Sequence, residues 1–261
     1  MFLITIPYLD LNKTYESNQN LKWLKLHEDK YIIIHKNNSC LVQQQPKNKF
    51  LFHCNDEQFF SIWYDYFDVS MDYSKVNSDI RALGGYFKNL SVISNGVRII
   101  NQDLYECIIG QITKSNYMLL CEMYGTKHVQ SFRECGKHTW YETPNADQLK
   151  STNDEQLLSL SQSLQDDHLD LESLKSMKYI TFKQSVSNVI VEPSVTYKKM
   201  FIYGNHGFDL FPKSKAMKHL VESKYDMSIS DFEEWVLDGL ENKAILYQYM
   251  VYDMMKERKG L

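Results

Sequence analysis

The stretch EPSVTYKK, from Glu192 to Lys199, carries one of the two most informative local signals in this chain. A proline leads a turn between two helical segments, and a lysine pair follows at the start of the second segment. Such a turn exposes backbone N–H groups that can hold a phosphate, and the N-terminus of the second helix favours an anion. Taken alone, however, the stretch is more typical of a surface lysine beside an ordinary interhelical turn.

A lysine at such a turn can also act as a nucleophile. Its amine attacks only when neutral, and an ordinary pKa near 10.4 leaves little neutral amine at pH 7. We expect desolvation and the neighbouring Lys199 to lower the pKa of Lys198. A second helix start follows in GFDLFPKSKAMKHL, where Pro212 precedes a helix whose expected N-cap is Ser214.

Apolar residues recur at helical spacing from residue 55 onward. The first such helix follows Asn55 or Asp56 as its cap and buries the Phe59–Phe67 run. Further helices are predicted from about 73 to 90, 103 to 123, 147 to 165, 169 to 176, 181 to 191, 197 to 203, 213 to 224, 230 to 240 and 243 to 258.

The residues before this point predict short strands instead. The strand candidates LITIPYLDL, NLKWLKL, YIIIH, CLVQQQ and FLFHC are separated by Asn, Asp, Lys and Pro clusters. The predicted fold class is therefore α+β. An antiparallel sheet domain at 1–54 packs on a helical domain at 55–261, which carries the hairpin near 192–197.

Composition excludes several classes of protein. No apolar run approaches the roughly 20 residues of a membrane helix, and the first residues lack a signal-peptide pattern, so we expect a monomer in the cytoplasm or nucleoid without membrane contact. The five cysteines form no CxxC pair, and no HxxxH or HExxH pattern occurs. We therefore expect reduced thiols, no iron–sulfur cluster, no metal and no other cofactor.

The net charge of −4 does not indicate nucleic-acid binding, but the charges are unevenly distributed. Residues 147–172 are acidic, whereas residues 198–224 are basic. One face could meet phosphate while the other stays in water. Ordinary solvated helix surfaces explain the same runs.

The order of motifs resembles the 8-oxoguanine DNA glycosylases. The segment GVRIINQDLYECIIGQITKSN, at 96–116, is similar to that family's helical signature, with GVR, QD, EC and S-N elements in order. SNQNLKW, at 17–23, resembles its SGQSFRW strand, and EPSVTYKK falls on its helix-hairpin-helix sequence LPGVGxKVA. The resemblance spans nearly the whole chain and is weakest between 125 and 167. It implies a helix-hairpin-helix glycosylase domain and double-stranded DNA as the partner.

The resemblance also implies site residues. The family's nucleophilic lysine falls on Lys198, which would attack C1′ of a flipped nucleotide, while its supporting aspartate falls on Ser214. Serine can still cap the helix but removes a negative charge, so we expect Asp209 to take part of that role. The catalytic candidates are thus Lys198, Asp209 and Ser214.

Other carried-over positions have changed chemically. The family's hairpin glycines fall on Ser194 and Thr196, its purine-reading glycine on Asn18, and its pocket glutamine and phenylalanine on Tyr247 and Val251. One cytosine-reading arginine falls near Cys121, and the other has no counterpart. We expect a base pocket formed by Asn18, Ile202, Tyr247 and Val251, and DNA contacts from Asn116, Ser194, Val195, Thr196, Lys199, Lys213 and Lys215.

Two functions remain open at this point. One is a glycosylase, with a lyase step, that flips and excises a damaged or modified base other than 8-oxoguanine opposite cytosine, in repair or in defence against foreign DNA. The other is a catalytically inactive module that binds damaged or distorted duplex. Lys198 and Asn116 favour the enzyme, and the lost carboxylate and hairpin glycines favour the module. An unrelated structural helical protein would require the collinear motifs to be accidental.

Overall fold

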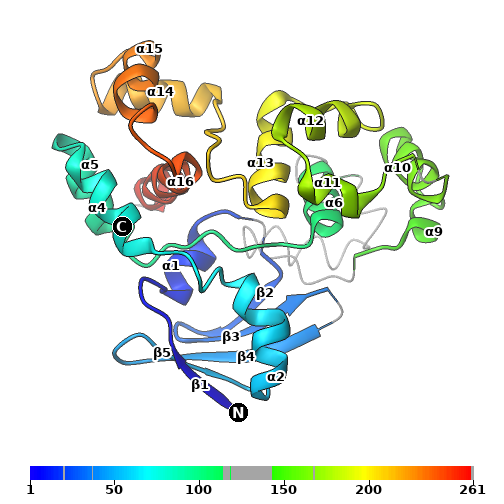
Figure 1. The fold of residues 1–261 in the computed structure, drawn as a ribbon, viewed down its shortest axis with the longest axis horizontal. Helices are drawn as coiled ribbons and strands as arrows, with labels where there is room; N and C mark the ends of the chain where they lie inside the picture. The colour runs from blue at the N-terminus through cyan, green and yellow to red at the C-terminus, as the bar shows by residue number, and fades with distance from the viewer. Residues whose placement is uncertain (20, 37, 114–117, 119–142, 167, 260–261) are drawn as a thin grey trace. The chain divides into compact units, whose positions relative to one another are not determined.

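The computed structural model describes residues 1–19, 21–36, 38–113, 118, 143–166 and 168–259 (Figure 1). Asn116 and Cys121, together with most of the 103–123 helix prediction beyond 113, lie outside these ranges. The chain forms two compact units. Unit 1 contains residues 1–19, 24–101 and 208–261, and unit 2 contains residues 20–23 and 102–207.

Unit 1 contains a five-stranded sheet with the order β1-β5-β4-β3-β2. Neighbours β1 and β5, β5 and β4, and β4 and β3 pair antiparallel. The strands are β1 (Phe2–Thr5), β2 (Trp23–His27), β3 (Lys30–His35), β4 (Asn38–Gln45) and β5 (Lys49–Phe52). All five end before residue 54, as the strand patterns predict.

One face of this sheet is covered by the helical segment that follows it. β3 alternates between partly and fully buried positions, and Phe50 and Phe52 of β5 are wholly buried. Asn55 starts the covering segment through a reciprocal capping box with Gln58. The Phe59 ring then lies 4.9 Å from the Phe52 ring, centroid to centroid. The change of hydrophobic period at residue 55 therefore marks the point where the chain turns back over the sheet.

The other helices of unit 1 come from both the N-terminal and the C-terminal parts of the chain. α5 and α1 both contact α16, and α14 contacts α15. The helical segments of unit 1 are α1 (Leu11–Glu16), α2 (Asp56–Gln58), the π-helical η1 (Phe59–Trp63), α3 (Tyr64–Tyr66), α4 (Tyr73–Ala82), α5 (Gly85–Ile93), α14 (Lys215–Lys224), α15 (Ile229–Asp231), the π-helical η2 (Phe232–Leu237) and α16 (Lys243–Lys259).

In its described part, unit 2 is helical apart from residues 20–23 and the connections. α13 packs on α6, α11 and α12, and α10 packs on α9. Its helices are α6 (Leu104–Thr113), α9 (Ala146–Leu149), α10 (Glu155–Gln165), α11 (Leu171–Ser176), α12 (Tyr179–Ser187) and α13 (Ser194–Asn205). No helix in the described ranges is long and apolar enough to cross a bilayer.

The predicted fold class, a sheet followed by helices, is confirmed. Two local predictions are wrong. The first strand ends at Thr5, and its predicted end at Leu11 begins the helix α1, which Asp10 caps by accepting a hydrogen bond from the Lys13 amide. The predicted 73–90 helix is two helices, because Gly84 and Gly85 adopt φ values of +72° and +49° and interrupt it. The boundaries of the two compact units do not coincide with the change from strands to helices at residue 54. The sheet and α16 belong to the same unit.

Candidate active site

The predicted hairpin is the connection between α12 and α13 in unit 2. The Tyr197 hydroxyl donates a hydrogen bond to the Ile190 carbonyl (2.6 Å) and accepts one from the Glu192 amide (2.9 Å). Tyr197 is buried, whereas Val191 in the turn is 80% exposed. The tyrosine therefore supports the turn from inside and leaves its outer surface open.

The three residues predicted to contact phosphate open α13. Ser194 is exposed, and Val195 and Thr196 are half-buried, all in helical backbone. Serine and threonine therefore occupy the two family glycine positions in a conformation that any L-residue adopts. The Thr196 amide already donates to the Pro193 carbonyl at 2.8 Å. Phosphate binding at this turn would consequently use the amides of Ser194 and Val195, at the positive end of a twelve-residue helix.

Lys198 lies in the second turn of α13. Its side chain is half-buried, and Nζ lies 6.0 Å from the centroid of the Tyr179 ring on α12. Burial lowers the pKa of the adjacent Lys199 from its ordinary value. Ile202, one turn after Lys198, is wholly buried in the structure. The helix therefore presents two lysines in different environments rather than one reactive pair on a surface.

α13 packs closely against α6. A Cβ added to Gly204 would lie 2.6 Å from Leu104 Cδ1 and 3.2 Å from Leu104 Cα, so a larger residue there requires Leu104 to shift. On the same contact, Cys107 Sγ donates to the Met200 carbonyl at 3.8 Å. Gly204 and Cys107 therefore lie in the interface between α6 and α13, the helix that contains Lys198.

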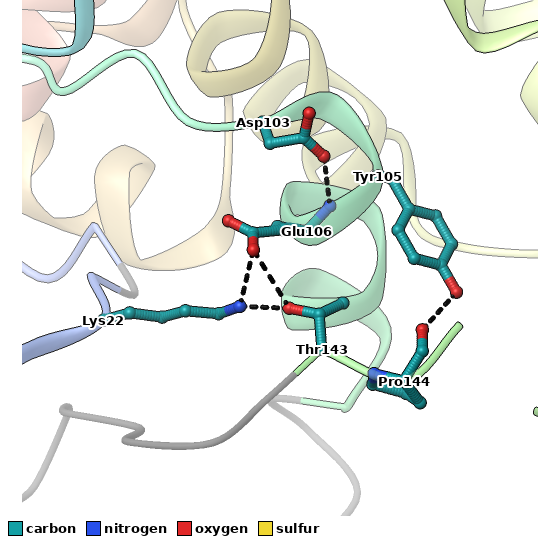
Figure 2. A network of polar contacts seen from close by, with 6 residues as sticks. All are labelled: Lys22, Asp103, Tyr105, Glu106, Thr143 and Pro144. Carbon is teal, nitrogen blue, oxygen red and sulfur yellow. Dashed lines mark hydrogen bonds and ion pairs between the residues drawn. The ribbon is translucent and has the colours of Figure 1, made fainter. Parts of the chain in front are cut away.

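The start of α6 carries a polar network (Figure 2). Lys22 Nζ lies 2.9 Å from Glu106 Oε1, and both side chains are nearly buried, with 9% and 13% of their surfaces exposed. The Thr143 hydroxyl joins this pair, and the Tyr105 hydroxyl donates to the Pro144 carbonyl at 2.6 Å. Asp103 Oδ1 accepts from the Glu106 amide at 3.1 Å and so caps the helix. The QD and EC elements of the sequence therefore anchor residues 22 and 143–144 to α6.

In unit 1, Ser214 occupies the predicted helix start. Its backbone is extended, and its hydroxyl accepts a hydrogen bond from the Met217 amide at 3.1 Å, so it is the N-cap of α14. The capping prediction is confirmed. Asp209, expected to supply the missing carboxylate, is exposed in the segment before the cap.

The two lysines predicted to bind DNA near this cap differ in their contacts. Lys213 is exposed and forms an ion pair with Glu233, which offsets its charge. Lys215 is also exposed and lies in the first turn of α14. Among the described residues, no ion pair engages Lys215, so it is the better placed of the two to meet a phosphate.

The predicted pocket residues on α16 lie on one apolar strip. Tyr247 and Val251 are one turn apart and are 4% and 7% exposed. The Tyr247 ring meets Phe211 edge to face, with centroids 5.6 Å apart. Burial raises the pKa of Tyr247, so its hydroxyl stays protonated at neutral pH. A buried aromatic ring therefore lies where the resemblance implies a glutamine.

Asn18 adopts the left-handed conformation, with φ of +66°. Asparagine tolerates this conformation better than most side chains, which explains how it can replace a glycine at this position. The flanking Ser17 and Gln19 are buried.

Sequence reasoning missed two buried glutamines that organise this turn. Gln19 Nε2 donates to the Arg98 carbonyl (2.6 Å), and Gln19 Oε1 accepts from the Ile100 amide (2.9 Å). Gln248 on α16 donates to the Ser17 carbonyl. The SNQ and GVR motifs are thus bonded directly to each other, and their joint presence was the available signal for Gln19. No pattern marked Gln248.

Metal binding finds no support in the described ranges, where no group of three or more His, Cys, Asp or Glu side chains could hold an ion. Cys40, Cys54 and Cys107 are free thiols. Burial raises the pKa of Cys40 to about 12, so this thiol is protonated at neutral pH.

Comparisons with known proteins agree with these motifs. Residues 1–108 match the family model described as the N-terminal domain of 8-oxoguanine DNA glycosylase. No curated protein sequence matches the chain. Solved structures also resemble it, among them three that it matches across nearly their full lengths. For MBOgg1, solved with a low-affinity DNA ligand, the TM-score is 0.80 at 18% identity, covering 99% of this chain and 96% of the other.

The second structure is the 8-oxoguanine glycosylase/lyase of Clostridium acetobutylicum bound to DNA with cytosine opposite 8-oxoguanine. Its TM-score is 0.77 at 17% identity, covering 98% of this chain and 94% of the other. The 3-methyladenine DNA glycosylase from Archaeoglobus fulgidus gives a TM-score of 0.68 at 12% identity, covering 97% and 99%. The resemblance to the 8-oxoguanine DNA glycosylases is therefore confirmed, in residues 1–108 by the family model and over the remainder by the shared fold.

Proposed function

We propose that this chain is a DNA glycosylase with an associated lyase step, which flips a damaged or modified base out of duplex DNA and excises it. The observation that carries the proposal is the α12–α13 hairpin. Its turn is supported by Tyr197, and Lys198 follows it on a helix docked against α6. A turn with free amides for a phosphate and a primary amine on the helix that follows it are what a lysine-dependent glycosylase requires.

In this mechanism the neutral amine of Lys198 attacks C1′ of the flipped nucleotide. The bond from C1′ to the base breaks, and the base leaves with the bonding electrons and gains a proton. Loss of the ring oxygen bond then gives a Schiff base between Lys198 and the opened sugar, from which β-elimination of the 3′ phosphate nicks the strand. The cationic character at C1′ calls for a nearby carboxylate.

Ser214 provides no carboxylate, and this changes the expected rate. We assign the supporting role in part to Asp209, which is the acidic residue of the segment leading to the Ser214 cap. Removing one well-placed electrostatic contact typically costs about 10²- to 10³-fold in rate. We therefore expect slow base release, with Asp209→Asn lowering turnover more than Ser214→Ala does.

The pocket wall supports a substrate other than 8-oxoguanine opposite cytosine. Tyr247 is 4% exposed and packs edge to face on Phe211, so the pocket wall that we propose is aromatic. An aromatic wall favours stacking on a flat base over hydrogen bonding to the edge of that base. The absence of recognisable cytosine-reading arginines in the sequence implies weak demands on the opposite strand. Such an enzyme would serve repair or defence against foreign modified DNA.

Borohydride trapping tests the proposal directly. The wild-type protein is incubated with duplexes carrying 8-oxoguanine, 3-methyladenine, hypoxanthine or uracil, each with and without borohydride, and both released base and trapped protein are measured. We expect Lys198→Ala to abolish trapping while DNA affinity stays within a few fold. Lys183→Ala, which removes a half-buried lysine from the neighbouring α12, is the matched control and should trap normally.

Lys199→Met separates the two adjacent amines. Because burial lowers the pKa of Lys199, it is the competing nucleophile on α13. Trapping that survives in Lys198→Ala but disappears in Lys199→Met would move the reaction to Lys199. Base release at an unchanged rate in both variants would show that water is the nucleophile.

The second candidate function is a module that binds damaged or distorted duplex without cleaving it. Ser214 favours it, because this residue caps α14 without contributing a carboxylate. A wild-type protein that binds these duplexes but releases no base from any of them would establish this function instead.

A further inference from the structure

Two cysteines lie opposite each other on neighbouring strands of the unit 1 sheet. β4 and β5 are antiparallel neighbours (Figure 1). The ladder between them continues for one step beyond the end of β5, because the His53 amide donates to the Leu41 carbonyl at 2.9 Å. The next positions in this register are Cys40 and Cys54. Both side chains therefore lie on the same face of the sheet, since directly opposite residues share a face.

The backbone geometry of this pair suits a disulfide bond. Leu41 and His53 form a hydrogen-bonded pair, so the adjacent Cys40 and Cys54 form a non-hydrogen-bonded pair, whose Cα atoms are typically about 4.5 Å apart. Disulfide-bonded cysteines have Cα atoms about 4.4–6.8 Å apart. The two thiols are also joined by a hydrogen bond in the reduced protein. Their sulfur atoms are therefore already in contact, and a bond between them requires little movement.

The two thiols differ in their access to solvent. Cys40 is 2% exposed, whereas Cys54 is half-buried at the end of the ladder. Burial raises the pKa of both thiols, and for Cys54 the hydrogen bond with Cys40 offsets part of the increase. Cys54 is therefore the thiol that a reagent from solution meets first, while Cys40 is reached through its neighbour.

We propose that Cys40 and Cys54 are a modification site, at which exchange with a small-molecule disulfide produces a reversible cross-strand disulfide. The Cys54 thiolate attacks one sulfur of the small molecule, whose S–S bond breaks, so that one thiol leaves and a mixed disulfide remains on Cys54. Cys40 then loses its proton and attacks the Cys54 sulfur, which releases the second thiol. The protein loses two protons and two electrons, and the small molecule gains them.

The bond would fasten the sheet at the point where the chain leaves it. Cys54 directly precedes Asn55, the N-cap of the helical segment that covers the sheet. A link from Cys54 to β4 closes the β4–β5 hairpin and fixes the start of that segment. The inference goes beyond the proposed function, because none of its residues is a candidate for the excision chemistry.

Thiol mapping tests this inference on the full chain. The reduced protein is incubated with oxidised glutathione, once in native buffer and once in denaturing urea, and its remaining thiols are alkylated before peptide mass mapping. In native buffer we expect the Cys40–Cys54 linked peptide as the main product, reversed by a dithiol. Cys107 is wholly buried in α6 and should stay reduced there. In urea the links should spread over several cysteine pairs.

Two matched variants separate the two chemical steps. Cys40→Ser removes the resolving thiol, so glutathione should stay on Cys54 as a lasting mixed disulfide. Cys54→Ser leaves only the buried thiol of the pair, so position 40 should remain unmodified in native buffer. A Cys40 that becomes glutathionylated in Cys54→Ser would contradict the assigned order of attack.

The melting temperature gives a second readout. Closing a short hairpin loop in the native geometry should raise it by about 5–10 °C in the oxidised protein relative to the reduced protein. A lower melting temperature after oxidation would show that the bond does not fit the native ladder. A wild-type protein that stops at the mixed disulfide, or that links the same pairs in buffer as in urea, would overturn the inference. Base release has no part in these assays, so a failure of the proposed function would leave their result unchanged.

Discussion

Gln19→Ala should be among the most destabilising single substitutions in unit 1. Gln19 is 1% exposed and bonds the Arg98 carbonyl at 2.6 Å and the Ile100 amide at 2.9 Å. Alanine leaves both backbone groups buried without this partner, and each orphaned group costs about 1–3 kcal/mol. The two together cost roughly 2–6 kcal/mol, a large share of a typical domain stability of about 5–15 kcal/mol.

Urea unfolding followed by tryptophan fluorescence measures this loss. The matched control is Gln44→Ala, because half-buried Gln44 makes one such bond, accepting from the Leu11 amide at 2.8 Å. We expect about 1 kcal/mol for the control. A loss in Gln19→Ala no larger than that in Gln44→Ala would refute the reasoning, because water would then be replacing the side chain.

Three further predictions concern unit 1. Burial raises the pKa of Asp68 from 3.8 to about 7, so the folded state binds this proton more tightly than the unfolded chain, and the contribution of Asp68 to stability declines as pH rises from about 4 to about 7. As the pH rises from 5 to 8, the free energy of unfolding of Asp68→Asn, measured with urea, should therefore increase on the order of 2 kcal/mol relative to that of the wild type. Parallel pH profiles of the two proteins would show that Asp68 does not titrate in this range. Gly96→Ala combines a φ of +101° with a Cβ placed 2.6 Å from Asp10 Cβ, so calorimetry should show a loss of about 2–4 kcal/mol, whereas Gly239→Ala, with its nearest atom at 3.9 Å, should lose little. Ser214→Asp retains a helix cap and adds the carboxylate, so base release should rise by roughly 10- to 100-fold without loss of stability, and an unchanged rate would show that the carboxylate is not limiting.

The structure makes the serine at position 214 a chemical change rather than a structural one. Ser214 Oγ accepts the same kind of capping bond that an aspartate would accept, so α14 begins normally. Under the proposed glycosylase function, we expect the rate of base release, rather than stability, to distinguish Ser214 from an aspartate.

Local sequence patterns were sufficient for the strands before residue 54 and for several of the helix starts. The strands before residue 54, the Asn55 cap, the hairpin at 192–197 and the Ser214 cap each depend on residues a few positions apart. Hydrophobic period and capping chemistry act over that range, so they can be recognised without the fold. The Gly84–Gly85 break was equally local, and the sequence interpretation overlooked it.

Only the tertiary structure shows which buried polar groups form hydrogen bonds with one another. Gln248 and Ser17 are 231 positions apart, and Gln19 and Arg98 are 79 positions apart. Neither pair leaves a periodic signal, because the partners are brought together by packing among α16, α1 and the segment after α5. The sequence shows the lysine pair but not the burial of Lys199. That burial, which lowers the pKa of Lys199, arises from how α13 packs among its neighbouring helices. A side chain's solvation and its hydrogen-bond partners are set by neighbours distant in sequence, and those neighbours exist only once the chain has folded.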